Sequence, residues 1–145
     1  MWGFLIAMIS GALMAIQGVF NTGVTKATGP WITNSFVQLT AFFVCAAFYL
    51  FSEMGKTSVG DLFKIDHKYM LCGGVIGAFI TFTVIKSMAA IGPAQATLAI
   101  VISQILVGYL IEVFGLFGVE KTDFLWNKLL GIAVALVGLI LYSKS

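Results

Sequence analysis

Five long apolar stretches run through almost the whole chain, and they constrain its fold more than any other feature. They cover residues 2–22, 30–51, 69–88, 93–114 and 124–142. An α-helix rises 1.5 Å per residue, so roughly 20 apolar residues cross the hydrocarbon core of a bilayer. Hydrophobic residues make up 60% of the chain and charged residues 10%, against about 45–50% and 25% in soluble domains. The sequence therefore predicts an all-α integral membrane protein, with residues 1–145 forming a single transmembrane domain of five helices.

The boundaries of these stretches carry their own signals. Pro30 and Pro93 are well placed at helix starts, because the first turn of a helix does not need the missing proline N–H. Trp126 and Tyr142 flank the last stretch, at the depth where amphipathic rings prefer to lie. No Lys or Arg precedes Lys26, so the first stretch lacks the charged start of a signal peptide and is predicted to span the membrane.

Charge is nearly balanced across the membrane. With five spans the two termini lie on opposite sides, and the lysines divide five to three between the N-terminal and the C-terminal side. The positive-inside rule acts on such differences and here only weakly favours a cytoplasmic N-terminus. Two oppositely inserted copies would resemble the inverted repeats of secondary transporters. The five lysines on the N-terminal side are Lys56, Lys64, Lys68, Lys121 and Lys128, and the other three are Lys26, Lys86 and Lys144.

Amide side chains recur at helical spacing inside three of the stretches. An amide without a partner in hydrocarbon costs several kcal/mol, so these faces must meet one another, water or a ligand. Hydrogen bonds between helices and contacts to a solute are both open for each amide. Three helices that carry such faces favour a shared polar cavity. The candidate solute-binding residues are Gln17, Asn21, Asn34, Gln38 and Gln104.

Glu112 is the only carboxylate within a predicted span. Such a group suggests solute binding or ion coupling. It also lies about one turn from the predicted end of its helix, and this position favours simple contact with headgroups and water over a functional role.

Small residues form two stripes that predict helix–helix contacts. Gly73 and Gly77 are four apart on the third stretch, and Gly131 and Gly138 lie on the fifth. Small residues let helices approach closely in lipid, where no hydrophobic force drives them together.

The sequence offers no support for other functional classes. Gly55-Lys56-Thr57 has Leu50 where a phosphate-binding loop needs glycine. His67 has no metal-ligand partner at the right spacing, and a net charge of +2 gives no nucleic-acid signal. We therefore expect a protein that is not an enzyme and has no metal, cofactor or nucleic-acid partner.

Short glycine-rich motifs carry a resemblance to a known family. Residues 73–78 (GGVIGA), 91–94 (IGPA) and 111–115 (IEVFG), with Ser103-Gln104, resemble the five-helix YdcZ-like branch of the drug/metabolite transporter superfamily. This branch is related to the EamA-type and small multidrug resistance transporters. The resemblance implies a half-length transporter subunit in the inner (plasma) membrane that pairs with a second copy of itself as an antiparallel dimer. It implies polar positions at Gln17, Asn21, Gln104 and Glu112. The first helix lacks the glutamate of the small multidrug resistance proteins, so their proton coupling is not carried over.

These observations predict a transporter that moves a small solute by alternating access around a polar cavity in a homodimer. Two alternatives remain open from the sequence. An accessory or scaffold subunit would have its polar faces closed on protein, and a passive channel would have a cavity open to both sides.

Overall fold

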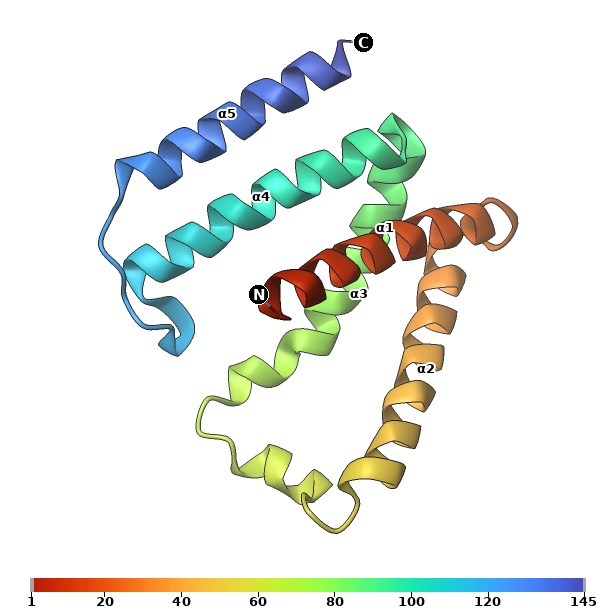
Figure 1. The fold of residues 1–145 in the computed structure, drawn as a ribbon. Helices are drawn as coiled ribbons and strands as arrows, with labels where there is room; N and C mark the ends of the chain where they lie inside the picture. The colour runs from red at the N-terminus through yellow and green to blue at the C-terminus, as the bar shows by residue number, and fades with distance from the viewer. Residues whose placement is uncertain (1, 145) are drawn as a thin grey trace. The chain divides into compact units, whose positions relative to one another are not determined.

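The described residues of the protein form five long helices (Figure 1). The computed structural model describes residues 2–144. Within that range there is no β-strand, and all five helices are long and apolar enough to cross a membrane. The predicted all-α class with five spans is confirmed. The helices are α1 (Trp2–Thr28), α2 (Pro30–Phe48), α3 (Gly73–Ile91), α4 (Pro93–Phe114) and α5 (Trp126–Ser143).

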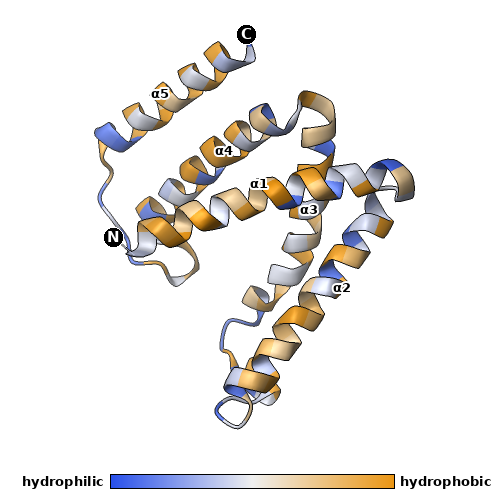
Figure 2. Ribbon diagram, turned by 45° about the vertical axis from the view of Figure 1, so that its right-hand side comes forward, coloured by the Kyte–Doolittle hydropathy of each residue, from blue (hydrophilic) through white to orange (hydrophobic). Residues whose placement is uncertain are grey.

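The surface of the helices is apolar. Figure 2 shows hydrophobic colouring along much of each long helix, with hydrophilic segments mainly at the connections. Phe4 is 81% exposed and Phe43 is 60% exposed, although each lies within a span. A soluble protein rarely presents so extensive an apolar surface, so this surface requires lipid as its solvent.

The chain divides into two compact units between Ala89 and Ala90. The first unit contains α1, α2 and α3 up to Ala89, and the second contains the last two residues of α3 with α4 and α5. Short helices fill the connections. They are η1 (Tyr49–Glu53), η2 (Val59–Lys64), η3 (Lys68–Cys72) and η4 (Leu116–Gly118).

Two Gly-Pro pairs set the starts of α2 and α4 with the same geometry. Gly29 has φ 84° and ψ 159°, and Gly92 has φ 83° and ψ 159°. A positive φ of this kind suits glycine, and the following proline takes the first helical position in each case. The predicted starts at residues 30 and 93 are those of the structure.

The start of α1 and the end of α4 also agree with the expected bounds, and the remaining bounds differ by a few residues. The helix α1 continues to Thr28 instead of ending near residue 22. The hydroxyls of Thr22, Thr25 and Thr28 each donate to the carbonyl four residues earlier, so these threonines do not compete with the helix. The second and third spans are completed by η1 and η3, which extend them to Pro30–Glu53 and Lys68–Ile91.

Within the first unit, α1 and α2 contact each other and both contact α3. The helices α1 and α2 diverge from the tight turn at Gly29 (Figure 1). Gly18 faces α3 so closely that an added Cβ would lie 2.5 Å from Met88 Cε. Trp31 at the start of α2 stacks on Phe82 of α3, with ring centroids 4.6 Å apart. The missing side chain at Gly18 and the stacked rings of Trp31 and Phe82 thus allow α1 and α2 to pack closely on α3.

Within the second unit, α4 and α5 lie side by side and run in opposite directions (Figure 1). Gly115 ends α4 in the left-handed conformation, with φ 64°, and its N–H donates to the carbonyl of Ile111. This is a common way for a helix to end, because glycine takes that conformation without strain. The connection then returns along α4, where the Thr122 N–H donates to the Glu112 carbonyl at 3.0 Å.

Candidate functional site

The two amides of α2 serve the contact with α3. Asn34 is 3% exposed, and its Nδ2 donates to the carbonyl of Ala78 at 2.7 Å. Gln38 Nε2 donates to the Thr81 hydroxyl at a longer 3.4 Å. The Thr81 hydroxyl donates in turn to the Gly77 carbonyl of its own helix. These two predicted solute contacts therefore act as hydrogen bonds between helices in this chain.

Asn34 retains one unsatisfied atom. Its Oδ1 is buried and finds no hydrogen-bond donor anywhere in residues 2–144. A buried acceptor without a partner costs about 1–3 kcal/mol. A negative charge at this oxygen would have no donor to stabilise it and would therefore strongly destabilise the fold.

The amides of α1 differ in burial although they lie one turn apart. Asn21 is 8% exposed, while Gln17 is exposed. Neither side chain has a hydrogen-bond partner within the described part of the chain. The hydroxyl of Thr25 donates to the backbone carbonyl of Asn21 and not to its amide. Gln17 thus presents an amide on an apolar helix, and no described residue of the chain hydrogen-bonds to it.

Gln104 is in the same situation on α4. Its side chain is exposed, and no group among residues 2–144 hydrogen-bonds to it. The neighbouring Ser103 hydroxyl, in contrast, donates to the carbonyl of Ala99 within the helix. Gln104 and Gln17 belong to different units, and the shared polar cavity stays a prediction.

Glu112 is paired. Its Oε2 accepts from Lys128 Nζ on α5 at 3.1 Å, and the two side chains are 46% and 44% exposed. Lys128 Nζ also lies 5.2 Å from the centre of the Tyr109 ring, within the range of a cation–π contact. Glu112 lies two residues before the end of α4, and Lys128 lies two residues after the start of α5. The ion pair is therefore at the end of the spans, and a role in ion coupling stays a prediction.

A cleft between α4 and α5 lies beside this ion pair. Its volume is about 450 Å³, within the ~300–1,000 Å³ typical of small-molecule sites. Tyr109, Glu112 and Lys128 form its polar part. The rest is apolar and is lined by Ile102, Ile105, Gly108, Gly131, Ile132 and Ala135.

Tyr109 and Lys128 are site residues that sequence reasoning missed. Tyr109 is 6% exposed, and its hydroxyl bonds both to the N–H of Leu125 at 2.6 Å and to the carbonyl of Leu125 at 3.1 Å. The available signal was the spacing of three residues between Tyr109 and Glu112, which places both on one face of a helix. Lys128 had been counted only as a topology signal, because its partner is 16 residues away in the sequence.

The four glycines predicted to form helix seams have few neighbours within the chain. An added Cβ would meet nothing within 4 Å at Gly73, Gly131 and Gly138, and at Gly77 only Gln38 Nε2 at 3.9 Å. Gly131 lines the α4–α5 cleft. A seam at these glycines with another helix outside the chain stays a prediction.

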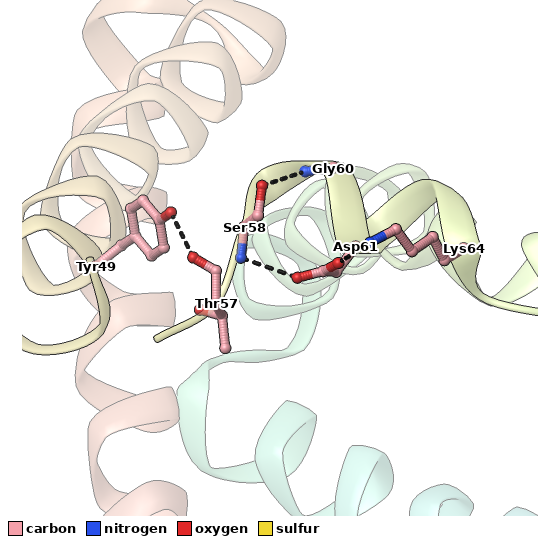
Figure 3. A network of polar contacts seen from close by, with 6 residues as sticks. All are labelled: Tyr49, Thr57, Ser58, Gly60, Asp61 and Lys64. Atoms are coloured by element: carbon pink, nitrogen blue, oxygen red, sulfur yellow. Dashed lines mark hydrogen bonds and ion pairs between the residues drawn. The ribbon is translucent and has the colours of Figure 1, made fainter. Parts of the chain in front are cut away.

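The connection between α2 and α3 has a separate polar network at η2 (Figure 3). Ser58 and Asp61 form a reciprocal cap, in which the Gly60 N–H donates to the Ser58 hydroxyl and the Ser58 N–H donates to Asp61 Oδ2 at 2.9 Å. Lys64 Nζ bonds to Asp61 Oδ1 at 2.6 Å. This contact is the main cause, with the Ser58 N–H second, of a pKa of Asp61 below its ordinary value of 3.8. Ser58, Gly60, Asp61 and Lys64 are all exposed, so the network orders the connection and is no binding site by itself.

The sequence matches a known family over almost its whole length. The family model described as "Putative inner membrane exporter, YdcZ" matches residues 2–141. Inner membrane protein YdcZ of Escherichia coli (strain K12) is 23% identical over 141 residues, which cover 97% of this chain and 93% of that protein. No solved structure matches the chain.

Proposed function

The chain belongs to the YdcZ family of the inner membrane, and on that premise we propose that it transports a small solute outward by alternating access as an antiparallel homodimer. The family description supports transport across the inner membrane, and its word exporter supports the direction. Five spans, which place the two termini on opposite sides of the membrane, support pairing with an inverted second copy, because inverted repeats are a frequent frame for alternating access.

Gln104 carries the proposal. It is an exposed amide on a span of high hydropathy, and no group within residues 2–144 hydrogen-bonds to its side chain. Left against lipid tails, such a group costs several kcal/mol. A second protomer that encloses a wet interior removes that cost and turns the amide toward a solute. Gln17 on α1 supports the same conclusion for the first unit.

The amides divide between two roles under this proposal. Gln17, Asn21 and Gln104 hydrogen-bond the solute, while Asn34 and Gln38 fix α2 against α3. A scaffold subunit would instead have Gln104 closed against protein. The two functions therefore differ in whether water reaches Gln104 in the assembled protein.

Counterflow in proteoliposomes across a panel of small solutes tests the proposal. For a transported solute, we expect Gln104→Leu to lower the counterflow rate about five- to tenfold, the effect of one lost hydrogen bond. Ser103→Ala is the matched control, because its hydroxyl is already satisfied within α4. Full activity in Gln104→Leu would remove this residue from the mechanism.

Topology reporters test the antiparallel arrangement. Reporters fused to the C-terminus are expected to give signal on both sides of the membrane, since the lysine bias is only five to three. Adding lysines to the connection at Gly29 should shift the signal toward one orientation. Signal from a single side in the unaltered protein would contradict the antiparallel homodimer.

A further inference from the structure

The α4–α5 cleft combines a charged rim with an apolar floor. The rim is the Glu112–Lys128 pair, and both side chains are almost half exposed. The floor is made of isoleucines and small residues, and Ile105 on it is 50% exposed. The cleft therefore opens outward along an apolar surface and has charge at one end only.

The depth of the Glu112–Lys128 rim in the membrane follows from how close both residues lie to the ends of their helices. Glu112 is two residues from the last residue of α4, a distance of about 3 Å along the axis. Lys128 is two residues into α5, and Trp126 just before it is 69% exposed. Tryptophan prefers the headgroup level, so the ion pair lies at that level and the isoleucines lie at the level of the acyl chains.

The rim has spare hydrogen-bonding capacity of both signs. Lys128 Nζ gives one hydrogen bond to Glu112 Oε2, and an ammonium has three N–H groups. Glu112 Oε1 has no donor among the residues that the structure describes. A ligand that carries both a phosphate and an amine would complement this pair, because each of its charges meets the opposite one.

We propose that the α4–α5 cleft binds a zwitterionic phospholipid with a primary amine, with its ammonium on Glu112, its phosphate on Lys128 and an acyl chain along the isoleucines. An anionic lipid without an amine brings its phosphate charge near Glu112 and offers no ammonium to Oε1, the oxygen that Lys128 does not bind. A lipid with a quaternary amine has no N–H for the carboxylate. The cleft therefore selects phosphatidylethanolamine over phosphatidylglycerol and phosphatidylcholine, and this selection is independent of transport.

Native mass spectrometry of the purified protein, titrated with these three lipids carrying identical acyl chains, tests the selection. We expect a one-to-one adduct with phosphatidylethanolamine at roughly three- to tenfold lower lipid concentration than with the other two. Glu112→Gln should remove that preference, whereas Glu120→Gln, the same change in the exposed connection, should retain it. Equal binding of all three lipids by the unaltered protein would overturn the proposal.

Two glycine variants test whether the lipid binds in the α4–α5 cleft. Gly131 and Gly138 both lie on α5 and both have nothing within 4 Å of an added Cβ, but only Gly131 lines the cleft. Gly131→Leu should fill the cleft and abolish the preferred adduct, while Gly138→Leu should leave it unchanged. Helix content by circular dichroism checks that both variants fold. A preferred adduct that survives Gly131→Leu would place the lipid elsewhere and overturn the assignment.

Discussion

The helix α3 packs tightly against α1 and α2, whereas α4 and α5 leave a cleft between them. Polar side chains in the two regions differ in their burial and in their hydrogen bonds. On α2, Asn34 is 3% exposed and bonds to the backbone of α3. On α4, Glu112 at the cleft is half exposed in an ion pair, and Gln104, away from the residues that line the cleft, is exposed and has no hydrogen-bond partner within residues 2–144. An amide within an apolar helix is thus no sign of a solute site by itself. The packing of its neighbour decides whether it joins helices or stays available to a ligand.

The largest effect is expected from a charge at the closed contact. In Asn34→Asp one carboxylate oxygen would lie about where Nδ2 is now, 2.7 Å from the Ala78 carbonyl oxygen. The other would lie at the position of Oδ1, which has no donor within residues 2–144. An uncompensated buried charge costs about 3–5 kcal/mol, and we expect a loss of that size in the free energy of unfolding, measured by denaturant titration in detergent.

Asn127→Asp is the matched control for this change. Asn127 is exposed in the first turn of α5, where a negative charge is weakly favourable because of the helix dipole. We expect a change within about 0.5 kcal/mol. Equal losses in the two variants would mean that Asn34 is not closed off as the comparison requires.

A smaller effect is expected from a bulky side chain at two glycines, one in each region. At Gly18 an added Cβ would lie 2.5 Å from Met88 Cε and 3.2 Å from Val84 Cγ1, and Met88 is 4% exposed. Gly18→Leu overpacks this contact, which typically costs about 1–3 kcal/mol. Gly131→Leu enters the open cleft, where nothing lies within 4 Å, and replaces a poor helix former by a good one.

Thermal unfolding in detergent measures this difference. We expect the midpoint to fall in Gly18→Leu and to stay the same or rise in Gly131→Leu. Gly11→Leu, on the same helix as Gly18 but with nothing within 4 Å, shows the effect of leucine without the clash. If Gly18→Leu is as stable as Gly11→Leu, α1 does not pack on α3 in solution.

The sequence predicted the spans well because their signals are local. The Gly-Pro pairs gave the starts of α2 and α4, and residues 93–114 coincide with α4. The end of α1 was placed too early, before Gly23 and Lys26, whereas the helix continues through both to Thr28. The hydroxyls of Thr22 and Thr28 bond to carbonyls within the helix and so do not end it.

The partners of the polar residues could not be predicted in the same way. Asn34 and Ala78 are 44 residues apart, and Glu112 and Lys128 are 16 apart. Which carbonyl or ammonium meets a given side chain depends on how the helices pack, and periodicity carries no information on that. The sequence therefore identified Glu112 as special but not the lysine and tyrosine beside it.

The smallest effect is expected from acid on the order of the connection at η2, compared with the connection after α4. The connection after α4 is fixed by the uncharged Tyr109 hydroxyl, whereas η2 is fixed by the Asp61 carboxylate. Because Lys64 and the Ser58 N–H hold the pKa of Asp61 below 3.8, its contribution to stability is fully present above the pKa of the unfolded chain. It is lost as the pH falls through the lower pKa of the folded state.

Acid should therefore break the hydrogen bond from the Ser58 N–H to Asp61. This loss would be measured as faster exchange of the Ser58 amide hydrogen, relative to the intrinsic exchange rate at each pH. Asp61→Asn should abolish this acid transition, and Asp66→Asn, in the same connection, should retain it. An acid transition at Ser58 that persists in Asp61→Asn would show that another group orders this connection.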